Sequence, residues 1–147
     1  MSVGLLDANV LIALAWPSHV HHERAHDWFD RHQANGWATC PLTQCAFVRA
    51  SSNSKIIDEA VSPQEALGLL TELVAHDSHE FWADDLPLTD AAMPTELLVG
   101  HRQVTDSYLL GLAMRRSGRL VTFDRGIQHL LERARKDDGF LELIASA

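Results

Sequence analysis

Short apolar runs alternate along this chain with longer segments whose apolar residues recur at helical spacing. Residues 3–6, 37–40 and 119–123 are typical of short buried strands, and a helical pattern follows each of them. Parallel strands that are neighbours in a sheet need a helical crossover between them. The alternation therefore predicts an α/β domain with a mainly parallel central sheet.

Helices are expected where amphipathic patterns are bounded by start and stop residues. The expected helices cover residues 10–15, 19–34, 43–51, 63–74, 105–117 and 126–136. The clearest start signal is the capping box formed by Ser62 and Glu65, with Pro63 at the first helical position. Residues 79–83 are either a strand or an irregular connection, and residues 140–144 are a possible last strand.

The composition is that of one folded domain. Hydrophobic residues make up 46% and charged residues 22% of the 147 residues, which argues against a disordered, collagen-like or membrane-spanning chain. No internal repeat or Pro/Gly/Ser-rich linker appears, so we expect a single domain over residues 1–147. The most apolar stretch, residues 3–16, contains Asp7 and Asn9 and lacks a basic flank, so we expect neither a signal peptide nor a membrane span and infer a cytoplasmic protein.

Two cysteines are present, Cys40 and Cys45. Their spacing fits neither a paired zinc-ligand motif nor a disulfide framework. We therefore interpret both as small buried hydrophobic residues.

Charge is distributed unevenly. The formal net charge is −8, whereas nucleic-acid binding usually shows as a basic footprint. Residues 1–100 carry 4 Lys and Arg against 14 Asp and Glu, but residues 101–147 carry 8 against 6. We therefore expect basic residues of the last third of the chain to make any contact with a polyanion. The alternative is that these arginines only form the solvent-exposed faces of helices.

Three aspartates could share one site. Asp7 and Asp124 directly follow predicted strands, where the ligand crevice of an open α/β sheet lies. Asp106 lies at the start of the helix that precedes the strand ending before Asp124. Periodicity alone does not show whether this helix starts at the same edge of the sheet as Asp7. Carboxylates gathered together repel unless a hard cation such as Mg²⁺ or Mn²⁺ neutralises them, which suggests phosphodiester hydrolysis. The alternative is that each aspartate only caps a helix.

Three ordered segments carry a family resemblance: LLDANVL at residues 5–11, VTDSYLL at 104–110 and LVTFDRG at 120–126. With them, nearly the whole chain resembles the PIN-domain family and, more narrowly, the VapC toxins of bacterial type II toxin–antitoxin pairs. The resemblance implies a single α/β/α sandwich domain and a Mg²⁺-dependent, cytoplasmic endoribonuclease. It also implies a homodimer that acts on RNA and is inhibited by a VapB-type antitoxin, whose C-terminal segment blocks the site.

The resemblance assigns roles to individual residues. Asp7 and Asp106 would be the principal ligands of Mg²⁺, and Asp124 an additional acid near the metal, all three at one edge of the sheet. Asn9 and Thr122 stand where the family tends to have small polar residues that orient the acids or a ligand water.

One position departs from the family pattern. Many members carry a further Glu on the helix after the second strand, where this chain has Ala46. Gln44 lies nearby in the sequence and could hydrogen-bond a metal-bound water, but it brings no charge. The absence of one carboxylate leaves open a second function, a catalytically weak PIN-like module that binds RNA or protein. In either case Arg49, Arg102 and Arg125 are candidate RNA contacts.

Residues 22–26 match the zincin pattern His-Glu-x-x-His, in which two histidines bind zinc and the glutamate is the general base. A zincin also needs a third ligand, and no later His or Glu stands in a motif that would supply one. The apolar face of this helix centres between Trp28 and Phe29, with His22 at its margin and Glu23 opposite. We therefore interpret the segment as a solvated amphipathic helix.

The opening Asp7-Ala8-Asn9 also resembles that of haloacid-dehalogenase-type phosphatases. Those enzymes need an acid at the second position, and Asn9 cannot donate a proton to a leaving group. A dinucleotide site is equally unsupported, because no glycine-rich fingerprint follows the first strand.

Overall fold

The computed structural model describes residues 2–134 and 139–145 and contains one five-stranded sheet with the strand order β3-β2-β1-β4-β5. Every neighbouring pair of strands is parallel. The strands are β1 (Gly4–Leu6), β2 (Trp37–Thr39), β3 (His79–Phe81), β4 (Arg119–Thr122) and β5 (Leu141–Leu143). The predicted α/β class and parallel sheet are confirmed.

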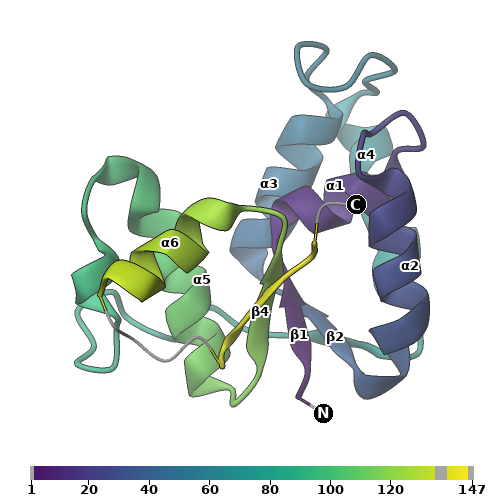
Figure 1. Ribbon diagram of the computed structural model, residues 1–147. Helices are drawn as coiled ribbons and strands as arrows, with labels where there is room; N and C mark the ends of the chain where they lie inside the picture. Colours follow the sequence, from purple (N-terminus) through teal and green to yellow (C-terminus); the bar gives the residue numbers. More distant parts are fainter. Residues whose placement is uncertain (1, 135–138, 146–147) are drawn as a thin grey trace.

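In the described part of the chain, six α-helices connect the strands and cover both faces of the sheet (Figure 1). They are α1 (Ala8–Ala15), α2 (His22–His32), α3 (Pro41–Ser51), α4 (Pro63–Val74), α5 (Val104–Arg115) and α6 (Arg125–Arg133). Helices α1 to α4 lie on one face, and α5 and α6 lie on the other (Figure 1). The molecule is thus the expected α/β/α sandwich.

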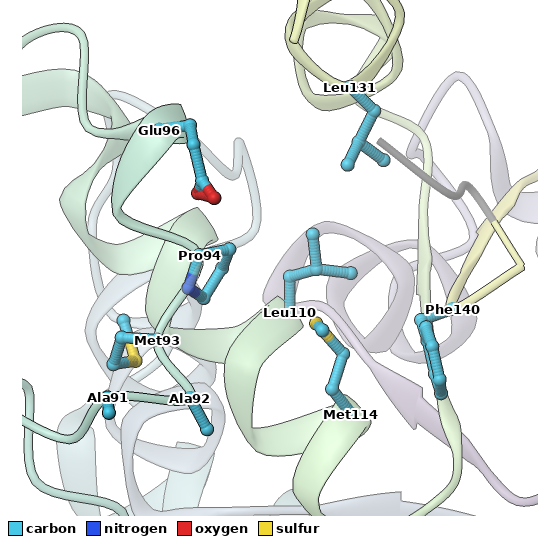
Figure 2. Close-up of a pocket in the computed structure, with 9 residues that line it drawn as sticks. All are labelled: Ala91, Ala92, Met93, Pro94, Glu96, Leu110, Met114, Leu131 and Phe140. Carbon is cyan, nitrogen blue, oxygen red and sulfur yellow. The ribbon is translucent and has the colours of Figure 1, made fainter. Parts of the chain in front are cut away.

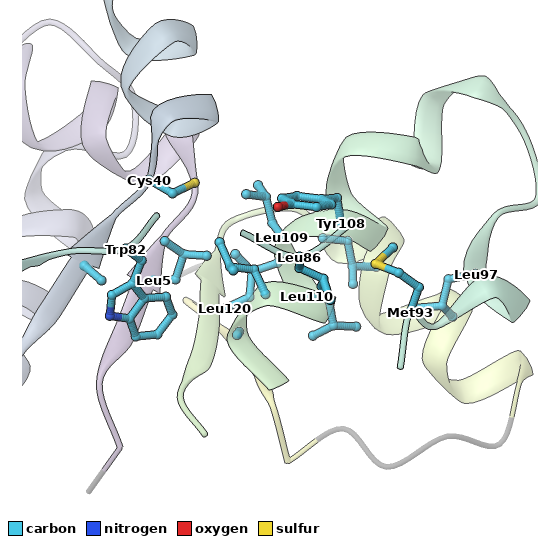
Figure 3. Close-up of a cluster of buried hydrophobic side chains, with 14 of the residues drawn as sticks. Leu5, Cys40, Trp82, Leu86, Met93, Leu97, Tyr108, Leu109, Leu110 and Leu120 are labelled. Carbon is cyan, nitrogen blue, oxygen red and sulfur yellow. The ribbon is translucent and has the colours of Figure 1, made fainter. Parts of the chain in front are cut away.

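Alternation along the strands explains why both faces are covered. Successive side chains of a strand point to opposite faces. Leu5 and Leu120 pack into the cluster under α5 and α6, which Figure 3 shows, whereas Leu6 and Val121 pack into the cluster under α1 to α4. All four side chains are fully buried. Burial on both faces is the physical reason that consecutive residues in the middle of the sheet, Leu5 and Leu6 on β1 and Leu120 and Val121 on β4, are all apolar.

Local signals place the helix ends. The Ser62 hydroxyl accepts a hydrogen bond from the Glu65 backbone N–H (3.1 Å), and the Glu65 carboxylate reaches back to the Ser62 N–H, so the predicted capping box is confirmed.

Before β2 the chain turns at Gly36, whose φ of +91° is a region that residues with a Cβ rarely adopt. This glycine sets the start of β2 directly after the 3₁₀ turn Gln33–Asn35.

The structure decides two points that the sequence left open, because residues 79–83 contain a strand and the possible last strand is present as Leu141–Leu143. Residues His79–Phe81 form a strand, and the connection to α5 contains two 3₁₀ turns, Thr95–Leu97 and His101–Gln103, that the sequence did not predict. The helix expected over residues 126–136 is described as far as Arg133, and its predicted end at Lys136 lies outside the described residues. No described helix is long and apolar enough to cross a membrane.

The prediction that both cysteines are buried is wrong for Cys45, which is exposed, and is confirmed for Cys40. On α3 the buried stripe runs through Thr43, Phe47 and Ala50. Cys45 is two positions from Thr43, about 200° around the helix axis, so its thiol faces away from the core.

Candidate active site

The sheet has one topological switch point, between β1 and β4. From β1 the chain adds β2 and β3 on one side, then crosses to the other side of β1 for β4 and β5. Ligand crevices of open α/β sheets lie outside the carboxyl ends of the strands at such a point. Asp7 follows β1, and Asp124 lies two residues after the end of β4. The Asp7 N–H donates to the Val121 carbonyl (2.9 Å), which ties the two strand ends together.

Thr122 is the hydrogen-bonding centre of this edge. Its buried hydroxyl donates to Asp7 Oδ2 (2.8 Å). The same oxygen accepts from Asn9 Nδ2 (3.1 Å) and from the Asp124 backbone N–H (3.0 Å). Asn9 Oδ1 in turn accepts from the Phe123 N–H (3.3 Å). The hydroxyl therefore uses its donor and both acceptor lone pairs to join the end of β4 to the start of α1.

Two of the aspartates also cap helices. Asp7 Oδ1 accepts from the Ala8 N–H (2.7 Å) at the start of α1, and Asp124 Oδ1 accepts from the Gly126 N–H (2.8 Å) at the start of α6. The capping role considered for these residues is therefore present. It also gives each carboxylate a fixed orientation at the carboxyl edge of the sheet.

Asp106 lies in the first turn of α5, where its side chain caps nothing. Burial raises its pKa to about 7, and the charges of Asp7 and Asp124 contribute to the increase. The contacts agree with this mutual effect: Asp106 and Asp124 line one cavity, and Thr122 is hydrogen-bonded both to the Asp7 carboxylate and to the Asp124 backbone N–H. Asp106 therefore lies at the same edge of the sheet as Asp7, which the sequence alone did not show.

The pKa of Asp7 is also raised. Burial is the largest cause; the hydrogen bonds from Thr122 and from the Ala8 N–H lower the pKa, and the charge of Asp124 raises it again. Two carboxylates that hold their protons more tightly than usual form a site that gains from a bound cation.

The residues fit a hard divalent cation by their chemistry. The oxygens of Asp7, Asp106 and Asp124 are ligands of the type that Mg²⁺ and Mn²⁺ prefer. Among the described residues, no group of three or more His, Cys, Asp or Glu side chains is close enough to hold a metal as a ready-made cage. Mg²⁺ uses one or two carboxylates and keeps several waters, so a partly open set of acids suits it.

An open cavity of about 320 Å³ lies beside the acids, between the start of α5 and the outer face of α6. Asp106, Asp124 and Arg102 all line it. The exposed Arg125 directly follows Asp124 in the chain, at the start of α6. Of the three arginines singled out in the sequence, Arg102 therefore shares the cavity of the acids, and Arg125 is the chain neighbour of one of them.

The remaining predicted site residues lie elsewhere. Gln44 and Arg49 line a separate groove between α3 and α4. The Gln44 amide donates to the Thr39 hydroxyl (3.0 Å), so it is already held within the fold. Ala46 is half-buried on the same helix.

The two histidines of the zincin-like pattern contact backbone carbonyls of α1. The His22 ring contacts the Ala13 carbonyl through Nδ1 (2.7 Å), and the His26 ring contacts the Leu14 carbonyl through Nε2 (2.8 Å). Both carbonyls belong to the last turn of α1, where no intrahelical partner is available. Glu23 is exposed, as the interpretation of a solvated amphipathic helix requires.

A second cavity, of about 190 Å³, is shown in Figure 2. It lies between residues 91–96, α5 and α6, and most of its lining is apolar. None of the three aspartates lines it.

Sequence reasoning missed two basic residues beside the acids. His129 and Arg133 line the same cavity as Asp106 and Asp124. With Gly126 and Leu130 they follow the i, i+3, i+4, i+7 spacing of one helix face. That spacing was readable in the sequence, but which neighbour this face meets was not.

A family model described as PIN domain matches residues 4–132. Ribonuclease VapC38 of Mycobacterium tuberculosis is 49% identical over 134 residues, which cover 91% of this chain and 94% of the relative. Ribonuclease VapC29 of the same organism is 43% identical over 126 residues, covering 86% and 89%.

Two solved structures have the same fold. One is VapBC2 from Rickettsia felis bound to a DNA fragment from its promoter, with a TM-score of 0.64, 14% identity, and coverage of 96% of this chain and 98% of that one. The other is DNA-bound VapBC from Salmonella typhimurium, with a TM-score of 0.62, 17% identity, and coverage of 99% and 100%. At these identities the likeness concerns the fold.

Proposed function

This chain belongs to the PIN-domain family, and on that basis we propose that it is a Mg²⁺-dependent endoribonuclease, the toxin component of a type II toxin–antitoxin pair. The observation that carries the proposal is the position of Asp7, Asp106 and Asp124 at the switch point of the sheet, where Thr122 bonds to Asp7 and to the Asp124 N–H and where Asp106 shares a cavity with Asp124. The relatives named ribonuclease VapC supply the substrate class.

The aspartates would hold the cation in different ways. Asp7 and Asp106 would be direct ligands, and Asp124 would act through a water. The raised pKa values of Asp7 and Asp106 mean that cation binding displaces protons and relieves the repulsion between the carboxylates. When bound, Mg²⁺ polarises a phosphoryl oxygen and acidifies a water, which is the chemistry that hydrolysis of a phosphodiester requires.

The other residues of the edge orient the acids. The Thr122 hydroxyl holds Asp7 Oδ2, and Asn9 holds the Thr122 oxygen and the following backbone N–H. Such outer hydrogen bonds direct carboxylate oxygens toward a metal. Thr122 and Asn9 are therefore positioning residues in this proposal.

The substrate would be single-stranded RNA or an RNA loop. A small open site needs an accessible backbone, which a duplex does not offer. Arg102 and Arg125 lie beside the acids and would hold the backbone phosphates. Arg49, in the groove between α3 and α4, would reach the RNA only on that other side of the molecule.

We also propose a VapB-type antitoxin as partner, a homodimer and a cytoplasmic location. The two solved structures of the same fold are VapBC complexes, which supports the antitoxin. Light scattering on the purified chain should give twice the mass of 16.3 kDa for a homodimer. A mass of one chain would contradict it.

Cleavage of a labelled single-stranded RNA tests the activity. Adding a chelator, or changing Asp7 to Asn, should abolish cleavage, and restoring Mg²⁺ should rescue the chelated protein only. Asp77→Asn is a matched control, because Asp77 is exposed before β3, at the opposite edge of the sheet. Cleavage that persists after chelation or in Asp7→Asn would reject the metal mechanism.

Ala46 favours a second candidate, a PIN-like module that binds RNA or protein but cuts weakly. Its methyl group stands where many family members have a carboxylate, so this chain has one potential ligand fewer. Calorimetric titration with Mn²⁺ separates the two candidates. Tight binding that is abolished in Asp106→Asn supports the nuclease, whereas binding that is absent from the unsubstituted protein favours the module.

A further inference from the structure

The cavity beside the acids is lined by both acidic and basic side chains, namely Asp106 and Asp124 together with Arg102, His129 and Arg133. All three basic residues are exposed. Asp124 caps the start of α6, here called the acid end, and His129 and Arg133 lie farther along that helix. Basic side chains that continue beyond a pair of acids suit a ligand that meets a cation first and presents further negative charge beyond it.

The basic side chains come from two elements that meet at this cavity. Arg102 belongs to the 3₁₀ turn that precedes α5, four residues before Asp106. His129 and Arg133 lie one helical turn apart on α6, and the stripe that contains them begins at Gly126, whose N–H holds Asp124. With a rise of 1.5 Å per residue, the stripe runs for about 10 Å away from the acid end.

Among the residues that the structure describes, Arg102 and Arg133 have no partner in the fold. The described ion pairs of arginine involve Arg115, Arg116 and Arg119, which pair with Asp85 or Glu142. Neither Arg102 nor Arg133 forms an ion pair or hydrogen bond with another described residue. Two guanidinium groups that line one cavity and have no acceptor in the described part of the chain are available to an anionic ligand.

From this geometry we infer that the cavity is a binding subsite for a backbone phosphate of RNA next to the one that is cleaved, held by Arg102, His129 and Arg133. The inference rests on the proposed nuclease function, because it takes the acid end as the place of cleavage. It adds the path of the substrate: the strand leaves the acids along the outer face of α6. The groove of Gln44 and Arg49 is not part of this path.

Binding measured without cleavage tests the subsite. In an Asp7→Asn background we would titrate a fluorescent single-stranded RNA by anisotropy, in magnesium buffer over a series of salt concentrations. Adding Arg102→Gln and Arg133→Gln together should weaken binding about tenfold, since exposed charge pairs contribute up to about fivefold each. The slope of log affinity against log salt should fall by about 0.7, because the two arginines share one phosphate and each neutralised phosphate of a single strand contributes about 0.7. His129→Ala should weaken binding in the same direction by a smaller factor.

Arg31→Gln is the matched control. It removes the same charge from an exposed arginine in the last turn of α2, which leads into the amino end of β2. It should leave the affinity and the salt slope nearly unchanged. Melting temperatures of all variants should agree, because the substituted side chains are exposed.

RNAs with a single neutral methylphosphonate linkage locate the contact. One linkage is neutralised at a time, and RNA affinity is compared with and without the substitutions Arg102→Gln and Arg133→Gln. The substitutions should not weaken binding of the RNA whose neutral linkage is adjacent to the cleaved bond. They should still weaken binding of RNAs that are neutral at other positions. The subsite would be overturned if RNA still binds and Arg102→Gln with Arg133→Gln weakens binding no more than Arg31→Gln does. That result would leave the nuclease proposal intact. Failure of the unsubstituted protein to bind or cleave any RNA would overturn both.

Discussion

The Thr122 hydroxyl donates a hydrogen bond of 2.8 Å to Asp7 Oδ2, across 115 positions of the chain. Thr122 ends β4, and Asp7 follows β1, its parallel neighbour in the sheet. Because the hydroxyl also accepts from Asn9 and from the Asp124 N–H, one buried oxygen orients the Asp7 carboxylate and holds the backbone at Asp124. This arrangement makes Thr122 a sensitive position for function.

Thr122→Val should reduce RNA cleavage by about 10- to 100-fold, as removal of the hydrogen bonds behind a metal ligand typically does. Valine keeps the shape but removes the donor to Asp7 and the acceptor for Asn9. Thr122→Ser, which keeps the hydroxyl, should retain most of the activity. Cleavage rates and Mn²⁺ affinities of both variants check this, and equal reductions in the two variants would contradict the role of the hydroxyl.

The raised pKa of Asp106 predicts how stability depends on pH. The folded protein keeps this proton up to about pH 7, whereas an Asp with its ordinary pKa of 3.8 releases it far earlier. Between these values the folded state binds more protons than the unfolded state, so the free energy of unfolding of metal-free protein should fall as pH rises through that window. Urea denaturation in chelator at several pH values measures this fall.

Asp106→Asn should flatten that pH dependence, because the amide does not titrate. Mg²⁺ should stabilise the unsubstituted protein more at pH 8 than at pH 5.5, since it competes with protons for the same oxygens. Identical pH profiles for the two proteins would show that Asp106 is not the group responsible.

The histidines of the His-Glu-x-x-His segment should affect stability and not catalysis. His22→Ala removes a hydrogen bond to the Ala13 carbonyl in the last turn of α1 and should lower the free energy of unfolding by about 1 kcal/mol. Glu23→Gln, at an exposed position of the same helix, should change neither stability nor RNA cleavage. Abolished cleavage in Glu23→Gln would revive the zincin interpretation.

Glu142 connects three elements of the fold. One of its carboxylate oxygens accepts from Arg119 on β4, and the other accepts from the Trp28 indole on α2. Glu142→Ala should lower the free energy of unfolding by about 2–4 kcal/mol, because it leaves the buried Arg119 guanidinium without its partner. Glu72→Ala, at an exposed position of α4, is the control and should change it by less than about 0.5 kcal/mol. Equal effects would mean that the Glu142 contacts contribute nothing.

Local signals explain which parts of the fold were readable from the sequence. The capping box at Ser62 and the apolar runs of β1, β2 and β4 act within a few residues, so pattern and propensity were sufficient to predict them. The 3₁₀ turns between β3 and α5 were missed, because they depend on packing against that helix and carry no such signal. The burial of Cys45 was predicted wrongly because cysteine is usually buried, whereas the position of Cys45 around the axis of α3 exposes its side chain to solvent.

The sequence by itself determined that this is a parallel α/β domain with aspartates at the strand ends, since strand periodicity and residue type are local properties. Only the tertiary structure decided that Asp106 joins Asp7 and Asp124, that Gln44 is held by Thr39, and that the basic stripe of α6 faces the acids. Those facts depend on the order of strands in the sheet and on which helix faces meet. They arise from contacts between residues far apart in the chain, which no local pattern specifies.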